Sequence, residues 1–464
     1  MNSHSPTTEH RPVLIVGGGL AGLSAALFLA ARGVSPLLVE RHAASSPHPR
    51  AIGITTRSLE LLRPLQLDPP IREVALGQER PRRVKAESLA GRWSDELAWT
   101  RPGPARQSDV QGPSASERSG EPLSPCLGAA IAQDELEPIL RRRAIALGVD
   151  VRMSTRVTSI EQHADHVEAH LVTSDGRTHC VRADYVIAAD GHNSSIRTAL
   201  GISRSGHGVM RALRSVLFRA PLDEYLERGI SQFMIEQEGL SGMLTTYRDG
   251  RWVLMFGDDT ERDEATLLGL VQRAIGRSDV PVELITTGRW VLSAQIAETF
   301  SRGRVHLIGD AAHTLPPARG GYGANTGIED AHNLAWKLAA VIAGQSQPRL
   351  LDTYDAERRP VAWLRHSQIF VRPDYAAEAT ELEKQAPVFA DEAIELGQLY
   401  RSGSVIGASD ELPPARSPEQ WAGQPGTRAP HVEVRHGEAS TSSVELLQRG
   451  WSTVAADPEW SMAA

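Results

Sequence analysis

The sequence predicts an α/β protein in which a larger α/β domain is interrupted by a mostly antiparallel β-sheet and followed by a short C-terminal extension. Three observations predict this class. An apolar run at residues 13–16 leads into a glycine turn and a helical run, and a second glycine loop near residue 309 is also followed by a helical run. Between them, residues 216–291 carry half-buried strand patterns instead. An inserted sheet explains how two halves of one ligand site come to be so far apart in the chain.

The first element is a nucleotide-binding turn. Residues 13–16 form a strand, glycines follow at G-x-G-x-x-G spacing, a helical run stops at Gly33, and a second strand ends in an acid. The glycines permit a tight turn and close approach of backbone N–H groups to a pyrophosphate, while the acid can accept from ribose hydroxyls. This context predicts a Rossmann-type domain that binds a dinucleotide through Gly17, Gly19, Leu20, Ala21, Gly22, Glu40 and Arg41.

The later elements can be read in order. Residues 101–125 are rich in Pro, Gly and Ser with few bulky apolar side chains, so we expect a flexible surface excursion. Helical spacing resumes at Gln133 and ends at Gly148, and strand patterns follow at residues 149–157, 166–172 and 181–189. The segment after residue 216 contains alternating strands and a turn at Asp249-Gly250, which predicts the inserted sheet.

Composition excludes several functions. The 464 residues carry a formal net charge of -8, without the basic patch expected of a nucleic-acid partner. The apolar run at residues 23–31 is too short to span a bilayer and the polar N-terminus lacks a signal-peptide core, so we expect a cytoplasmic protein without membrane association. Cys126 and Cys180 have no partners at disulfide or zinc spacing, and we expect no metal site.

Two further motifs complete the ligand site. Asp190, Gly191, Ser194 and Arg197 lie in DGHNSSIR, and Gly309 and Asp310 lie in GDAAH, before a loop of prolines and glycines at residues 316–325. With the first turn, these motifs resemble those of the class A FAD-dependent monooxygenases, the para-hydroxybenzoate hydroxylase-like group. Within that group the chain resembles the bacterial polyketide and natural-product hydroxylases, a branch that includes flavin-retaining cyclases of spirotetronate pathways.

The resemblance implies FAD as the cofactor and NADPH or NADH as its reductant. It implies a Rossmann-type, GR2-like FAD-binding domain in two parts, residues 11–200 and 299–400, with the substrate-binding sheet at residues 201–298 and a shortened extension at residues 401–464. By motif position, the further cofactor-binding residues are Arg50, Gln133, Asp190, Gly191, Arg197, Gly309, Asp310, Pro317, Gly321, Gly323, Ala324 and Asn325.

Elementary physics agrees with this assignment. A helix that begins near Asn325 would direct its free N–H groups and positive dipole end toward the ligand of the preceding loop. Gly321 and Gly323 would let the backbone approach a flat ring closely. We therefore expect this loop to border the isoalloxazine.

The leading hypothesis is a monooxygenase that hydroxylates an aromatic or polyketide-derived small molecule with O2 through a flavin C4a-hydroperoxide. An FAD-retaining [4+2] cyclase without net redox chemistry is the alternative, because the loop between His313 and Asn325 is one residue longer than expected in common relatives and the C-terminal extension is short. A non-catalytic FAD-dependent binding module is a third class. The protein is expected to be a monomer or a homodimer.

Substrate contacts are predicted only from strand alternation. The large side chains of the inserted sheet should place one face over the flavin cavity, and those with a polar tip are preferred. No catalytic acid or base can be named from the sequence. The candidates for substrate contact are Phe233, Met243, Tyr247 and Trp252.

Overall fold

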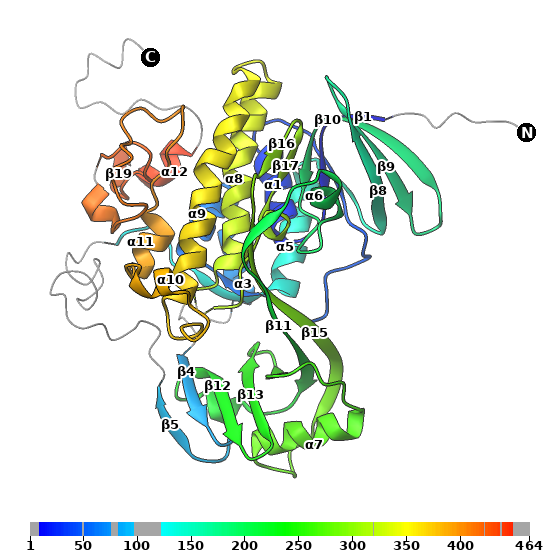
Figure 1. The fold of residues 1–464 in the computed structure, drawn as a ribbon, viewed down its shortest axis with the longest axis vertical. Coiled ribbons are helices and arrows are strands. Elements are labelled where there is room, and N and C mark those ends of the chain that lie inside the picture. The colour runs from blue at the N-terminus through cyan, green and yellow to red at the C-terminus, as the bar shows by residue number, and fades with distance from the viewer. Residues whose placement is uncertain are drawn as a thin grey trace, which may run out of the picture.

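The computed structural model describes residues 9–48, 51–75, 82–96, 122–318, 320–421, 423–436 and 439–448. In this part of the chain two eight-stranded sheets dominate the fold, one in the upper half of Figure 1 and one in the lower half. Two long strands, β11 (Arg204–Arg219) and β15 (Glu283–Ala297), run from one half to the other. The α/β fold with an inserted, mostly antiparallel sheet is therefore as predicted.

The first sheet is the Rossmann-type one. Its central strands pair in parallel and are buried in the apolar core. The strand order is β16-β17-β10-β1-β2-β7, with the hairpin β8–β9 paired to β10. The strands are β1 (Glu9–Val16), β2 (Leu37–Val39), β7 (Asp150–Arg152), β8 (Thr155–Gln162), β9 (Val167–Thr173), β10 (Thr178–Ala188), β16 (Ser301–Arg302) and β17 (Val305–Leu307).

Helices pack on this sheet through one large apolar core. Helix α1 contacts both α5 and α8, and α8 lies against α9 in the centre of Figure 1. The helices of this half are α1 (Leu20–Ala30), α2 (Thr56–Leu62), α3 (Asp68–Val74), α5 (Gln133–Ala146), α6 (Ser195–Ala199), α8 (Tyr322–Ile342) and α9 (Asp352–Phe370). A small pair of strands, β3 (Ile52–Ile54) and β6 (Ala129–Ala132), completes it.

The second sheet has the order β18-β15-β11-β14-β13-β12-β4-β5, and α7 (Glu264–Ile275) covers one face. Its other strands are β4 (Arg82–Ala86), β5 (Trp93–Glu96), β12 (Ile230–Gln237), β13 (Leu240–Thr246), β14 (Arg251–Phe256) and β18 (His313–Thr314). All pairs are antiparallel except β4 with β12.

One expected boundary was wrong, and one expected helix is present. Residues 82–96 were assigned to the first part of the FAD-binding domain, whereas β4 and β5 extend the second sheet beyond β12. Strands as short as these carry too little sequence pattern to show which sheet they join. The helix expected near Asn325 is α8, which begins three residues earlier at Tyr322, after Gly321 with a left-handed φ of 61° at the N-cap.

The C-terminal segment lies beside α9 (Figure 1), and its helix α11 also contacts α2. It contains α10 (Glu381–Gln385), α11 (Asp391–Leu396), β19 (Glu433–His436), β20 (Ala439–Ser442) and α12 (Ser443–Leu447). Arg428 donates to the buried Glu60 carboxylate, and Arg63 Nε lies 2.7 Å from Glu445 Oε1. Ion pairs thus hold this segment to α2 and to the residue that follows it.

Some predictions fall outside the described residues. These are the role of Arg50, most of the expected excursion at residues 101–125, and the last residues from 449 onward. None of the helices in the described part of the chain combines the length and the apolar character needed to cross a membrane.

Candidate active site

The first glycine turn forms one end of a large cavity. Gly17 has a φ of 114°, and a Cβ there would lie 2.1 Å from the Ala189 carbonyl oxygen. A Cβ on Gly22 would lie 1.9 Å from the Gly17 carbonyl oxygen, so α1 approaches the turn too closely for any side chain. No side chain among the described residues caps α1 at Gly19, and its first N–H groups remain available to an anion.

Glu40 stands beside this turn at the end of β2. Its Oε2 accepts a hydrogen bond from Gly18 N at 2.7 Å, and its Oε1 accepts one from His42 N at 2.9 Å. The carboxylate is thereby fixed next to the cavity, which Arg41 also lines. A fixed acid at this strand end fits the ribose hydroxyls of a dinucleotide.

The Asp190 motif supplies a second polar group. Asp190 Oδ2 accepts from Ile196 N at 3.2 Å, whereas its buried Oδ1 has no hydrogen-bond partner among the described residues. Asp190 and Gly191 both line the cavity. A ligand hydroxyl would satisfy the remaining oxygen.

Arg197 does not line the cavity, contrary to its prediction as a cofactor-binding residue. Its buried guanidinium donates to the Ala311 carbonyl oxygen at 2.9 Å and to the His192 carbonyl oxygen at 3.4 Å. Arginine donors in this motif therefore join the segment after Asp190 to the segment after Gly309.

Gly309 and Asp310 also line the cavity. Gly309 has a φ of 57°, and a Cβ there would lie 2.9 Å from Ala21 Cβ. Its N–H donates to Asp330 Oδ2 at 3.3 Å, and the same oxygen lies 2.6 Å from His313 Nε2. Asp310 is exposed to the cavity.

Asp330, which the sequence analysis missed, fixes this turn through the contacts of its buried carboxylate with Gly309 and His313. Burial by itself raises the pKa of its carboxyl, but His313 and Arg358, whose Nε donates to Oδ1 at 2.8 Å, outweigh that effect and lower the pKa. The ionised carboxylate is thus retained at 0% exposure. Its only sequence signal was an acid on the helix after the loop.

The loop after His313 presents backbone to the cavity. Pro317, Gly321, Gly323 and Ala324 line it, at the N-terminus of α8. Asn325 does not, although it was predicted to bind cofactor. Its Oδ1 accepts from Ser58 Oγ at 2.6 Å and Thr55 N at 2.9 Å, while its Nδ2 donates to the Gly321 carbonyl oxygen at 2.7 Å. Asn325 therefore holds the loop to α2.

The cavity has a volume of about 1610 Å³ and extends from the glycine turn to the second sheet. Gln133 lines the cavity, and its Nε2 donates to Glu137 Oε1 at 2.7 Å. Burial raises the pKa of the Glu137 carboxyl. Of the predicted cofactor-binding residues, those that line the cavity are Gly17, Gly19, Leu20, Ala21, Glu40, Arg41, Gln133, Asp190, Gly191, Gly309, Asp310, Pro317, Gly321, Gly323 and Ala324. Gly22 packs just behind them.

The second sheet turns one face to this cavity. Cross-strand pairing places Met234, Met243 and Met255 side by side, and all three line the cavity together with Tyr247. Sequence alternation identified Met243 and Tyr247 but missed their partners, because only the strand register shows which residues of neighbouring strands share a face.

Phe233 and Trp252 were predicted as substrate contacts and do not line the cavity. Both are 0% exposed and pack in the apolar core between the sheet and α7. Phe233 pairs with Leu244, which follows Met243 in β13. Successive residues of a strand point to opposite faces, so the Phe233 side chain points away from the face that carries Met243. Ordinary sheet packing therefore explains these two aromatic residues.

Polar side chains also line the cavity. Arg83 bridges to Asp374 at 2.8 Å and to Gln232 Oε1 at 3.0 Å, and all three line the cavity. Burial raises the pKa of the Tyr247 and Tyr375 phenols, with a nearby carboxylate adding to the effect in each case. Both phenols therefore stay protonated, and Tyr375 donates its O–H to the Pro317 carbonyl oxygen at 2.8 Å.

An indole is held in the same wall. Trp290 Nε1 donates to Ser215 Oγ at 2.7 Å, and that oxygen lies 2.9 Å from His48 Nε2. The His48 and Trp290 rings make an edge contact at 5.4 Å. Trp290 thus offers a fixed aromatic surface, and sequence reasoning did not single it out.

The glycine cradle, the carboxylate at the strand end and the free helix N-termini fit FAD. The chain matches the family described as "FAD binding domain" over residues 10–367 and belongs to it. Within that family it is a class A FAD-dependent flavoprotein monooxygenase of the polyketide hydroxylase branch.

Individual relatives resemble the chain over nearly all its length. It is 37% identical to tetracenomycin B2 monooxygenase-dioxygenase of Streptomyces olivaceus, over 96% of this chain and 83% of that protein. It is also 37% identical to 4-methyl-5-nitrocatechol 5-monooxygenase of a Burkholderia species, over 99% and 85%. The crystal structure of aklavinone-11 hydroxylase with FAD and aklavinone superposes with a TM-score of 0.80, at 35% identity, over 96% of this chain and 83% of that one.

Proposed function

We propose that this monooxygenase hydroxylates a polycyclic, polyketide-derived aromatic substrate bound between the flavin loop and the methionine face of the second sheet. The observation that supports this most is the size of the cavity. Its volume of about 1610 Å³ exceeds the roughly 300–1,000 Å³ of ordinary ligand pockets. One continuous space can therefore take a dinucleotide and a second large ligand.

The cofactor-binding roles assigned above are part of this proposal. Glu40 would hold the adenosine ribose, the α1 N-terminus at Gly19 the pyrophosphate, and Asp310 the ribityl chain. The N–H groups at the start of α8 would face the ring. FAD, when bound, takes a hydride from NADH or NADPH and activates O2, so that one oxygen atom reaches the substrate.

The protein's own contribution is orientation and exclusion of water. Met234, Met243 and Met255 offer an adaptable apolar surface to a flat ring system. Tyr247 presents an aromatic ring to the substrate. Tyr375 donates its O–H to the Pro317 carbonyl oxygen at 2.8 Å, so its phenol oxygen can accept a hydrogen bond from a substrate hydroxyl. No side chain has to act as a nucleophile in this scheme.

Two relatives have names that give substrates of different size. One acts on the polyketide tetracenomycin B2 and one on a nitrocatechol, by their names. A single catechol ring would leave much of the methionine face uncovered, which favours the larger substrate. The names of the relatives also favour oxygenation over the non-redox cyclisation considered as the alternative. A monomeric or homodimeric state and a cytoplasmic location belong to the proposal as well.

The test is a substrate panel with the FAD-loaded protein. Tetracyclic aromatic polyketides and substituted catechols are titrated while the flavin absorbance and the rate of NADH or NADPH oxidation are recorded. We expect the polycyclic compounds to perturb the flavin spectrum at low micromolar concentration and to accelerate nicotinamide oxidation. A response to catechols alone would contradict the proposed substrate class.

A further inference from the structure

Three side chains from distant segments meet outside the cavity, at the junction of β11 with the helices α9 and α10. His207 Nε2 lies 2.9 Å from Glu383 Oε2, and His366 Nδ1 lies 3.7 Å from Glu383 Oε1. One ligand atom from each residue lies within 4.8 Å of the others. We propose that His207, His366 and Glu383 form a binding site for a divalent transition-metal ion, with Zn²⁺ as the preferred ion.

The distances suit this ion. Zinc binds imidazole nitrogen and carboxylate oxygen at about 2.0–2.2 Å, so ligands of a tetrahedral site lie about 3.4 Å from one another. The two measured distances from Glu383 bracket that value, and small side-chain shifts would admit the ion. Two imidazoles and one carboxylate form a borderline donor set that favours zinc over magnesium or calcium, and three protein ligands leave a fourth position for water.

The backbone is shaped to present His207. Gly206 pairs with Gln295 and Gly208 with Ala294, so His207 is the extra residue of a β-bulge, flanked by glycines with φ of 122° and 78°. Bulges re-aim a side chain out of the regular ladder. A Cβ on Gly206 would also lie 3.2 Å from His366 Nε2, so this glycine allows the second imidazole to approach.

The surroundings fix the ligands in place. His207 stacks on Phe370 with ring centroids 3.8 Å apart, and the side chain of His366 is 4% exposed. Glu383 Oε2 also accepts from Thr380 N at 2.8 Å and Thr380 Oγ1 at 2.9 Å. Such outer partners orient the carboxylate ligands of metal sites.

A bound ion would link β11 to the segment that follows α9. Phe370 ends α9, and Asp374 and Tyr375 a few residues later line the cavity. Metal binding would therefore stabilise one wall of the active site without contact to the substrate. Chain spacing alone could not reveal this site, because its ligands are far apart in the sequence.

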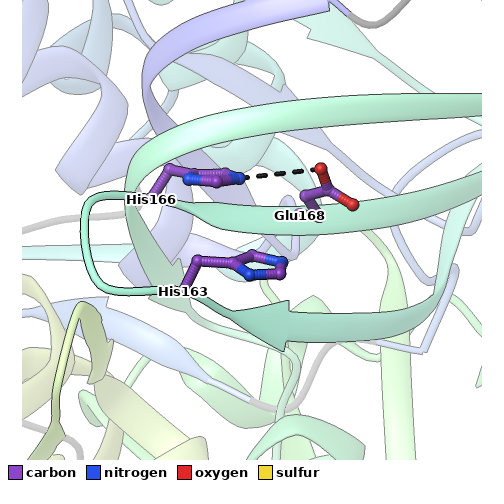
Figure 2. Close-up of side chains that lie close together, drawn as sticks. All are labelled: His163, His166 and Glu168. Atoms are coloured by element: carbon purple, nitrogen blue, oxygen red, sulfur yellow. Dashed lines mark ion pairs between the residues drawn. The ribbon is translucent and has the colours of Figure 1, made fainter.

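A second histidine cluster, in the hairpin β8–β9, provides the comparison (Figure 2). The rings of His163 and His166 stack 4.5 Å apart, and His166 Nε2 lies 3.6 Å from Glu168 Oε1. His166 Nδ1 already contacts Asp165 Oδ1 at 2.7 Å, and His163 is exposed. All these ligands come from one solvent-facing hairpin, and we expect it to bind metal weakly.

The test measures Zn²⁺ binding to the tag-free, FAD-loaded full chain after treatment with a chelator. We expect one ion per chain by calorimetry, a higher thermal midpoint with Zn²⁺, and visible d–d absorption of tetrahedral Co²⁺. Glu383→Gln keeps a side chain that can still complete the capping box with Thr380 but is a poor metal ligand. This variant and His207→Ala should each weaken Zn²⁺ binding at least tenfold.

The matched control is the double variant His163→Ala and His166→Ala, which should bind as the natural protein does. The inference is overturned if the natural chain binds no Zn²⁺ at micromolar concentration, or if Glu383→Gln binds as tightly. Loss of binding in the hairpin double variant alone would also overturn it. Each readout is independent of hydroxylation, so the outcome does not depend on the proposed function.

Discussion

The tight contact between α1 and the first glycine turn makes Gly22→Ala the most informative substitution in the cofactor site. A Cβ at this position would lie 1.9 Å from the Gly17 carbonyl oxygen and 3.3 Å from Ala189 Cβ. Because Cβ atoms essentially never come within 3.0 Å of such a neighbour, the helix and the turn must separate by about 1 Å. That shift moves the N–H groups at Gly19 away from a bound pyrophosphate.

The magnitude follows from a matched control. Gly269 also lies within a helix, α7, but a Cβ there would meet nothing within 4 Å. Both substitutions gain about 1 kcal/mol of helix propensity, while only Gly22→Ala has to bear an overpacking cost of about 1–3 kcal/mol. We therefore expect Gly269→Ala to be slightly stabilised, and Gly22→Ala to be less stable than Gly269→Ala by about 1–3 kcal/mol.

The assay is titration of flavin-free protein with FAD, followed by fluorescence, beside chemical denaturation. Displacement of the turn should weaken FAD binding in Gly22→Ala at least tenfold, which corresponds to about 1.4 kcal/mol. The reasoning would be refuted if both variants bound FAD within twofold of each other with equal stability.

Three other predictions concern the cavity wall, the loop support and the C-terminal segment. Met243→Trp should raise KM for a polycyclic substrate at least tenfold with FAD content unchanged, whereas Trp252→Phe, on the opposite face, should leave KM alone and cost about 0.5–3 kcal/mol of stability. Asp330→Asn should cost about 3–5 kcal/mol in urea denaturation. Because the pKa of Asp330 is lowered, its stabilising contribution should be complete above the ordinary aspartate value of about 4 and disappear as the pH falls below it. Equal stability loss for the variant at low and neutral pH would contradict this. Arg428→Ala should lower the free energy of unfolding by about 1–3 kcal/mol, because the buried Glu60 carboxylate loses one of its two arginine partners. The C-terminal segment should then detach, and faster proteolysis after residue 423 should show this.

The sequence predicted the parts of the fold in which local pattern and chemistry coincide. Gly17, Glu40 and Gly309 each require a particular backbone or charge next to a strand end, and all three lie where the motifs placed them. The position of a residue in a motif could not show whether its side chain lines the cavity or supports the residues that do. Arg197 and Asn325 carry motif signals, yet their side chains bind other parts of the protein.

The substrate face could not be predicted for a different reason. A strand's alternation defines two faces, but which face is covered by α7 depends on tertiary packing. Phe233 and Met243 looked equivalent in sequence, but the register of β12 with β13 pairs Met243 with Met234, so Phe233, the residue before Met234, points to the opposite face. Likewise β4 and β5 join the second sheet through pairing with a strand more than a hundred residues later.

The central claim is that FAD and a polycyclic substrate share one cavity, in which one oxygen atom of O2 is transferred to the substrate while the other leaves as water. The direct measurement is turnover of the FAD-loaded protein with NADH or NADPH under ¹⁸O2, with the product analysed by mass spectrometry. We predict a product that carries one labelled oxygen atom, and no conversion when oxygen or nicotinamide is withheld. Formation of an unlabelled isomer of identical mass under anaerobic conditions would contradict the account.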